Sequence, residues 1–218
     1  MTPGPTQIIA CPHCAALAKY TTINSGNTFG LRMWSDGKQI APMLPLPPAV
    51  VKCHQCEKCY WLDDAKEIGT LNEWGDDEDV QPIDPSWLTA PLIEEPDEMS
   101  YYAAIASGLA TTPEHERNLR LLAWWKSNDP WRHSASASRP HLSQASRQNL
   151  NALVRLFNQA DENDQCIKAE ALRELGEFDL ASSLLSQITS EPYANVISQL
   201  RAFCDAKDAS VRELRLES

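Results

Sequence analysis

The spacing of apolar and polar residues changes once along this chain of 218 residues, close to Pro96. Before that point, apolar residues form short runs bounded by turn residues, a pattern typical of β-strands. One turn, Ser35-Asp36-Gly37, lies between the extended segments 27–34 and 38–43. Because glycine adopts a positive φ without steric cost, this Asp-Gly step predicts a β-hairpin.

After Pro96, apolar residues recur at intervals of three and four, which predicts about six helices with brief connections. Thr112 followed by Pro113 is typical of a helix start, because threonine caps the first turn and proline suits the first helical position. The apolar faces of the later helices include Leu119, Leu122, Ala123, Leu150, Leu153, Val154, Phe157, Val196, Ile197, Leu200 and Phe203. Together the two patterns predict an α+β protein, with a small antiparallel β domain followed by an all-α domain.

A stretch of distinct composition separates the two patterns. Residues 76–99 contain nine Asp and Glu residues and no Lys or Arg, within a chain whose net charge is −11. Acidic chain interrupted by proline favours an extended, solvated state. We therefore expect a β domain at 1–75, an acidic proline-rich linker at 76–96 and a helical domain at 97–218. Trp87 offers an alternative for part of the linker, as an anchor onto one of the domains.

Four cysteines carry the strongest chemical signal. Cys11-Pro-His-Cys14 and Cys53-His-Gln-Cys56 are both C-x2-C pairs, and 38 residues separate them. Two thiolates on one tight turn can bind one side of a tetrahedral ion, and a second such turn completes the shell. Soft thiolate ligands favour zinc, and four of them leave no open position for water. The pattern predicts one structural Zn²⁺ and no catalytic metal.

A fifth cysteine leaves the ligand set open to one alternative. Because Cys56-Glu-Lys-Cys59 is also C-x2-C, the second pair could be shifted by three residues. We favour Cys53 and Cys56, because the expected strand at 50–52 leads directly into that turn. Cys59 is then either an alternative ligand or a free thiol near the site.

These cysteine pairs resemble the two knuckles of the zinc-ribbon superfamily, including the proline after the first ligand. The resemblance covers about residues 8–68 and implies a β-ribbon closed by one zinc ion. The chain departs from the family pattern at the residue after each pair, where Ala15 and Glu57 replace the usual glycine.

The helical half contains a second resemblance. Residues 171–185, with Gly176, Phe178 and Ala181, resemble the turn between the two helices of a tetratricopeptide repeat. The match covers one helical hairpin and implies stacked helix pairs that offer a groove to another chain. The whole chain, with Leu122-Ala-Trp-Trp125 and Asn128-Asp-Pro130, also resembles uncharacterised bacterial zinc-ribbon proteins, a resemblance that brings no assigned activity.

The cellular compartment follows from the cysteine count and from apolar runs. The seven cysteines are an odd number, and five belong to metal-type clusters, which fits a reducing cytoplasm. We expect no signal peptide, because the first residues lack a basic start and an apolar core. No apolar run approaches the roughly 20 residues that span a bilayer. We predict a cytoplasmic protein without a membrane partner.

Catalytic patterns are missing from the sequence. It contains no phosphate-binding glycine loop, no G-x-G-x-x-G and no G-x-S-x-G. We predict that the chain is not an enzyme but an adaptor or regulator that binds a protein partner still to be identified. The candidate contact residues are Trp124, Trp125, Arg132, Arg139 and Arg147.

Three alternatives remain. One is a toxin-neutralising, immunity-type binder whose acidic connector covers a basic partner. Another is a zinc-ribbon factor that binds nucleic acid through the region Arg132–Arg155, which contains four arginines and, from Pro130 to Ala160, no acid. The last is a thiol sensor in which Cys59 exchanges with the metal site.

Overall fold

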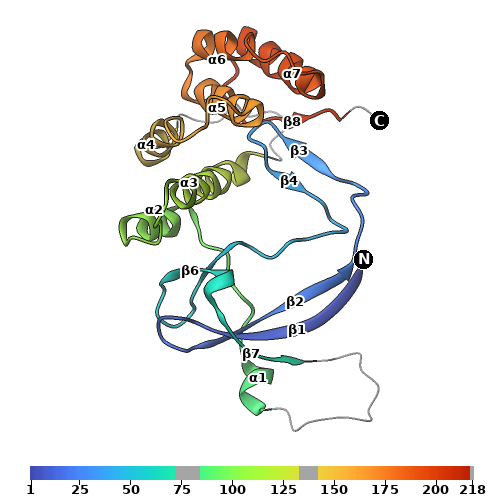
Figure 1. Cartoon of the computed structure of the whole chain (residues 1–218), viewed down its shortest axis with the longest axis vertical. Coiled ribbons are helices and arrows are strands. Elements are labelled where there is room, and N and C mark those ends of the chain that lie inside the picture. The colour runs from blue at the N-terminus through green and yellow to red at the C-terminus, as the bar shows by residue number, and fades with distance from the viewer. Residues whose placement is uncertain (72–83, 133–141, 217–218) are drawn as a thin grey trace. The chain divides into compact units, whose positions relative to one another are not determined.

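The computed structural model describes residues 1–71, 84–132 and 142–216, which fold as an α+β protein (Figure 1). The chain divides into two compact units that interleave along the sequence. The first unit contains Met1–Leu31 and Ala41–Leu109, and the second contains Arg32–Ile40 and Ala110–Ser218. A segment between the two cysteine pairs therefore belongs to the helical half.

A three-stranded antiparallel sheet forms one part of the first unit. Strand β1 (Thr2–Ala10) lies between β2 (Leu17–Ser25) and β7 (Lys66–Leu71). Ile8 and Ile9 of β1 are buried. The turn between β1 and β2 carries the first cysteine pair.

A two-stranded ribbon forms the other part. Strands β5 (Val50–Lys52) and β6 (Cys59–Trp61) pair in antiparallel register, with Val51 opposite Tyr60. Val50, Val51 and Tyr60 are buried, and a short 3-10 helix (Leu62–Asp64) leads towards β7. The turn between β5 and β6 carries the second cysteine pair, so both pairs lie in hairpin turns.

The second half of the expected linker packs on the first unit. Helix α1 (Pro85–Thr89) is capped by Asp84, and a Cβ atom at Gly69 would come within 2.1 Å of the Trp87 ring. Beyond α1, Lys19 exchanges two backbone hydrogen bonds with residues 91 and 93, and the Lys52 N–H donates to the carbonyl of residue 94. Residues 91–94 therefore join β2 to β5. The remainder of the expected linker, 76–83, lies outside the described residues.

Helix α2 (Glu98–Ala106) also belongs to the first unit, although the sequence assigned it to the helical domain. Asp97 caps it by accepting a hydrogen bond from the Ser100 N–H at 2.7 Å. Tyr101 is buried, and the Trp61 indole donates to the Leu109 carbonyl at 3.4 Å. Packing against β6 thus extends the first unit to Leu109, beyond the expected boundary at 97.

Within its described residues, the second unit contains five α-helices. They are α3 (Pro113–Asn128), α4 (Gln144–Leu153), α5 (Glu162–Leu175), α6 (Phe178–Leu185) and α7 (Ala194–Asp205), with 3-10 turns at Asp129–Trp131 and Glu191–Tyr193. Thr112 caps α3 through the His115 N–H, as the sequence predicted. Gly176, with φ of 88°, ends α5. Two apolar clusters hold the helices together, one including Trp124, Leu150 and Leu153 and the other Leu185, Ile197 and Leu200.

A small sheet completes the second unit. Strands β3 (Arg32–Trp34) and β4 (Gln39–Ile40) form the hairpin expected at Asp36-Gly37, and β8 (Glu213–Leu214) pairs with β3. The hairpin itself is therefore confirmed, but it folds with the helices and not with the cysteine-bearing strands. The physical reason is that the buried Asp36 carboxylate has its partners in Asn128 of α3 and in Arg132, directly after the 3-10 turn. The Arg132 guanidinium also lies over the buried Trp34 ring, 5.3 Å from its centroid.

Among the described residues, no helix has both the length and the apolar character needed to cross a bilayer.

Candidate metal centre

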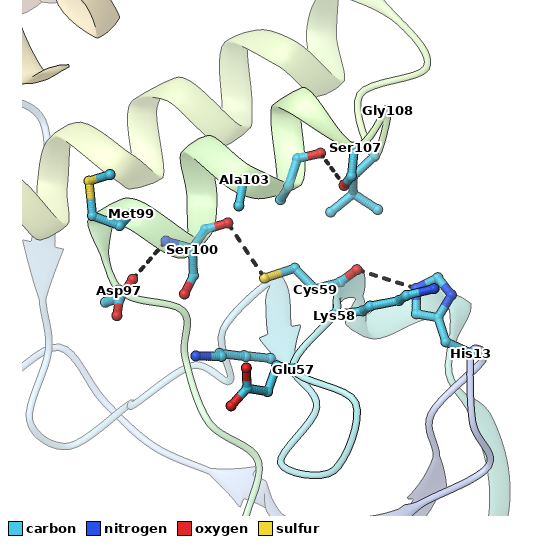
Figure 2. Close-up of a pocket in the computed structure, with 13 residues that line it drawn as sticks. His13, Glu57, Lys58, Cys59, Asp97, Met99, Ser100, Ala103, Ser107 and Gly108 are labelled. Carbon is cyan, nitrogen blue, oxygen red and sulfur yellow. Dashed lines mark hydrogen bonds between the residues drawn. The ribbon is translucent and has the colours of Figure 1, made fainter.

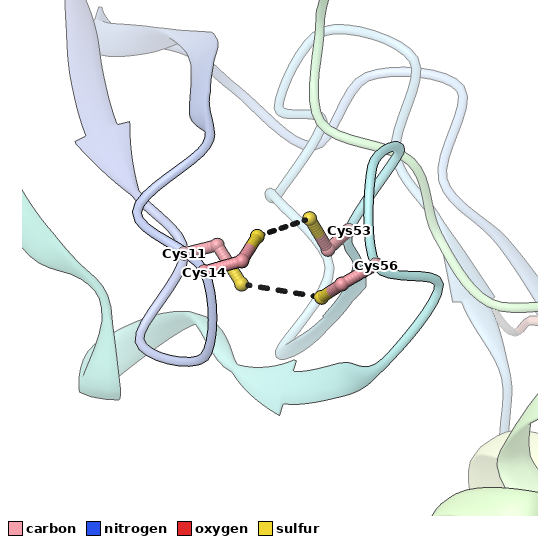
Figure 3. Close-up of side chains that lie close together, drawn as sticks. All are labelled: Cys11, Cys14, Cys53 and Cys56. Atoms are coloured by element: carbon pink, nitrogen blue, oxygen red, sulfur yellow. Dashed lines mark hydrogen bonds between the residues drawn. The ribbon is translucent and has the colours of Figure 1, made fainter.

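The two cysteine turns have the same backbone geometry. In each turn, the N–H four residues after the first cysteine donates to the carbonyl of that cysteine, at 2.9 Å for both Cys11 and Cys53. The N–H of the first cysteine donates in turn to the carbonyl five residues later, at 2.9 Å and 3.0 Å. These bonds close each turn and direct both of its thiols to one side (Figure 3).

The residue after each pair adopts a left-handed backbone conformation. Ala15 has φ of 59° and Glu57 has φ of 58°. These are the two positions at which the zinc-ribbon pattern usually has glycine. A non-glycine residue in this region costs about 1–2 kcal/mol, so the rest of each turn offsets local strain.

The four thiols of the two turns form one cluster (Figure 3). The Sγ atoms of Cys11, Cys14, Cys53 and Cys56 all lie within 4.8 Å of one another. Two distances between the turns are 3.9 Å, for Cys11 and Cys56, and 3.6 Å, for Cys14 and Cys53. A tetrahedron of sulfurs 2.3 Å from a central ion has edges of about 3.8 Å. The donor set therefore fits a tetrahedral thiolate-bound metal ion.

Backbone N–H groups favour the thiolate form of the first cysteine in each turn. The His13 N–H lies 3.4 Å from the Cys11 sulfur, and the Gln55 N–H lies 3.4 Å from the Cys53 sulfur. Burial dominates at Cys11 and raises its pKa to about 12. At Cys53, burial also disfavours the charged form, but the N–H groups of Cys56 and Gln55 and neighbouring thiols outweigh it, and the pKa falls to about 7.

Cys59 is separate from this cluster. It begins β6, and its thiol donates to the Ser100 carbonyl on α2 at 3.8 Å (Figure 2). Burial is the main reason that its pKa is raised. Of the two ligand sets left open by the sequence, the set with Cys53 and Cys56 is the one whose thiols gather.

A cavity of about 610 Å³ lies between the second cysteine turn and α2 (Figure 2). Asp97 lies at the edge of the cavity, and its pKa is lowered. The main cause is the hydrogen bond that its carboxylate accepts from the Ser100 N–H, and the charge of Lys52 is a lesser cause. Helix α2 contributes apolar and small side chains, of which Met99 is 63% exposed. The cavity is lined by His13, Lys52, Glu57, Lys58, Cys59, Asp97, Met99, Ser100, Ala103, Ala104, Ser107, Gly108 and Leu109.

Sequence patterns did not reveal this cavity. Its lining residues from 97–109, such as Ala103 on α2 and Leu109 after that helix, were assigned to a different domain from the cysteine turns. The apolar and small residues of 97–109 are a helix signal, but nothing in their spacing names β6 as the packing partner.

Two of the predicted partner-contact residues need correction. Trp124 is 1% exposed, and its indole donates to Glu174 at 2.8 Å. Arg132 is 5% exposed and pairs with Asp36. Adjacent tryptophans and an arginine-rich stretch suggested a surface, but the helices and the β3–β4 hairpin bury these two side chains.

The other predicted contact residues differ in their accessibility. Trp125 is half-buried and donates to the Asp36 carbonyl at 3.0 Å. Arg147 is exposed and donates to the Leu175 carbonyl at 3.2 Å. Arg139 lies outside the described residues. Arg132 therefore does not contribute to the exposed positive charge of the region expected to contact nucleic acid.

The fold and the thiol cluster define the class of the molecule as an α+β protein with a candidate four-cysteine metal site that is consistent with a zinc-ribbon-like centre. No protein family model, no curated protein and no solved structure matches the chain.

Proposed function

We propose that this chain is a non-enzymatic zinc protein that binds another protein. The observation that carries the proposal is the arrangement of four thiols from two hairpin turns around one point. Four thiolates would fill every position of a tetrahedral ion, leaving none for water or substrate. Such an ion holds structure together and does not act on a bound molecule.

Zinc suits the donor set and the size of the first unit. Soft thiolates select zinc among the ions of a reducing compartment. Binding an ion at such a site contributes on the order of 10 kcal/mol to folding of a small module. The cluster formed by Cys11, Val51, Cys53 and Tyr60 is small, so the ion would supply much of the stability of the surrounding structure.

The helical unit supports the proposal as a scaffold and not as the site of the partner. The α5–α6 hairpin, with Gly176 in its turn, has the order of elements expected of a tetratricopeptide-like pair. Units of this kind commonly provide surfaces for other chains. The proposal therefore combines a metal-stabilised module with a helical scaffold, without a catalytic group.

We place the partner at the cavity beside the second cysteine turn. Its volume lies within the range of known ligand sites. The lining of the cavity has charges of both signs, from Lys52, Glu57, Lys58 and Asp97. The exposed Met99 offers an adaptable apolar contact. This mixture suits a protein segment better than a single small anion.

Native mass spectrometry of protein purified from its own host tests the proposal. We expect one zinc per chain and a stoichiometric protein partner. Ala103→Arg, which places a long side chain in the cavity, should abolish co-purification. Ala106→Arg is the matched control, because Ala106 is exposed on the same helix but does not line the cavity.

Other results would redirect the proposal. Absence of metal would contradict the structural zinc site. Bound RNA in place of a protein would favour the nucleic-acid alternative, and equal loss of the partner in both arginine variants would remove the cavity from the argument.

A further inference from the structure

The β3–β4 hairpin contacts alternate helices of the second unit. Asp36 and Gly37, at its turn, meet residues of α3 and α5, and Met33 and Ser35 lie with residues of α5 and α7 around a shared small cavity. In a stack of helix pairs, alternate helices face the same side. We call the surface made by α3, α5 and α7 the alternate-helix face.

An ion pair holds the hairpin at the α3 end of this face. The Arg132 guanidinium donates to both carboxylate oxygens of Asp36, at 3.0 Å and 2.6 Å. The Asp36 side chain is 0% exposed and that of Arg132 is 1% exposed. The Asn128 amide donates to the same carboxylate at 2.9 Å. All three groups are removed from water and satisfy one another.

Close packing holds the hairpin against α5 and α7. A Cβ atom at Gly37 would lie 2.6 Å from the Ile167 Cδ1 on α5. The space left between the hairpin and the two helices is only about 30 Å³, close to the volume of one water molecule. This part of the face has no room for a second chain.

The C-terminal strand covers the edge of the hairpin. Met33 lies opposite Leu214 in the β3–β8 pair. The Ser35 N–H donates to the Arg212 carbonyl at 2.7 Å, and the Arg212 N–H donates to the Ser35 hydroxyl at 2.9 Å. The hairpin is therefore bound by helices through its turn and by a strand along its edge.

We infer that residues 32–40 are the permanent occupant of the alternate-helix face, so that the surface which a helical repeat offers to a peptide is filled here by the chain itself. Removing the hairpin would take the buried Asp36 carboxylate away from Arg132 and leave it with one ion pair, to the partly exposed Asp129 at 2.8 Å. Loss of a buried partner of this kind destabilises proteins. The inference goes beyond the proposed function and depends on neither the metal nor the cavity beside it.

Hydrogen exchange in the full-length, metal-loaded protein tests this inference. The amides of Trp34 and Gly37 both donate within the hairpin. If the hairpin is a permanent occupant, they exchange within about ten-fold of the amides in the middle of α5, and urea accelerates both sets in parallel. Exchange of the hairpin amides more than about 100-fold faster than α5 would overturn the inference, because it would reveal a hairpin that leaves the face while the helices stay folded.

Two variants separate the buried ion pair from an exposed one. Asp36→Asn should accelerate exchange of the hairpin amides on the order of 100-fold relative to the wild type. The control is Glu213→Gln, which removes the charged partner of Arg32. The two side chains of this pair are 40% and 42% exposed, so the substitution should change the exchange of the hairpin amides little. Equal effects of the two variants would contradict the assigned role of Asp36. If Asp36→Asn fails to fold, the wild-type comparison still decides the question.

Discussion

Ala15 and Glu57, which directly follow the cysteine pairs, have a backbone conformation that glycine adopts more easily. Both turns nevertheless close with the same hydrogen bonds. The backbone conformation of each turn is therefore determined by the thiols and the flanking strands. The intrinsic backbone preference of Ala15 and Glu57 opposes this conformation.

Substitution at Ala15 measures the free-energy cost of the left-handed backbone conformation at this position. We expect Ala15→Val to lower the free energy of unfolding by about 1–2 kcal/mol, because a β-branched side chain fits the left-handed region poorly. Ala15→Gly should leave it unchanged or raise it by up to about 1 kcal/mol. Urea denaturation of the metal-loaded protein gives both values. Equal stability of the valine and glycine variants would show that this turn is not strained.

Protons and a metal ion would compete for the four thiols, and the pKa values of the thiols give the direction in which metal affinity changes with pH. The pKa is about 7 at Cys53 and about 12 at Cys11. The pKa is also raised at Cys14, where the Ala16 N–H lowers it but burial and neighbouring thiols outweigh that effect. Below pH 7 the thiols of Cys11, Cys14 and Cys53 hold protons that an ion must displace, so metal affinity falls as pH falls. We expect a loss on the order of 10³-fold per pH unit between pH 5.5 and 6.5.

The slope should decrease by about one proton above pH 7, where the Cys53 thiol is already ionised in the metal-free protein. Zinc competition against a chelator of known protonation measures both slopes. Cys59→Ser is the control, because Cys59 is not one of the clustered thiols. A changed slope in that variant would contradict the assigned ligand set.

At the scale of elements, the hairpin turn has two reasons for its glycine. Gly37 has φ of 79°, and a Cβ atom there would overlap Ile167. Gly176, in the same unit, has φ of 88°, but a Cβ atom there would meet nothing within 4 Å. The two positions separate backbone strain from packing.

We expect Gly176→Ala to cost about 1–2 kcal/mol of unfolding free energy, from backbone strain alone. Gly37→Ala should cost about 1–3 kcal/mol more, because the methyl group forces the hairpin and α5 apart. Equilibrium unfolding followed by helical circular dichroism measures the difference. Equal losses would place the hairpin turn away from Ile167.

The sequence predicted local elements well and their assignment to units less well. The hairpin at Asp36-Gly37, the start of α3 at Thr112 and the clustering of four cysteines depend on neighbouring residues or on fixed spacing. The partner of Asp36 is Arg132, 96 residues further along the chain, and no local pattern encodes such a pair. The cavity beside α2 escaped prediction for the same reason, since its two sides come from segments about 40 residues apart.

At the scale of the molecule, an ion bound by the four clustered thiols would stabilise one unit directly. All four clustered thiols belong to the first unit, whereas the contacts of the β3–β4 hairpin described above lie within the second. Chelation should therefore unfold the cysteine turns and leave most helical circular dichroism in place. The first unit should lose on the order of 10 kcal/mol of stability.

Cys53→Ser should reproduce the effect of chelation, and Cys59→Ser should not. Thermal unfolding followed separately in the near and far ultraviolet distinguishes the two units. Loss of the helical signal in the same transition as the metal would show that the units fold as one.

The position of the hairpin between Cys14 and Cys53 has a consequence for inheritance. No single cut of the chain yields both compact units, because each is assembled from two separate stretches. A gene segment that starts after Leu109 would encode helices lacking Trp34 and Asp36. Recombination at one crossover point therefore cannot transplant either unit intact, and the two halves of this protein are constrained to evolve together.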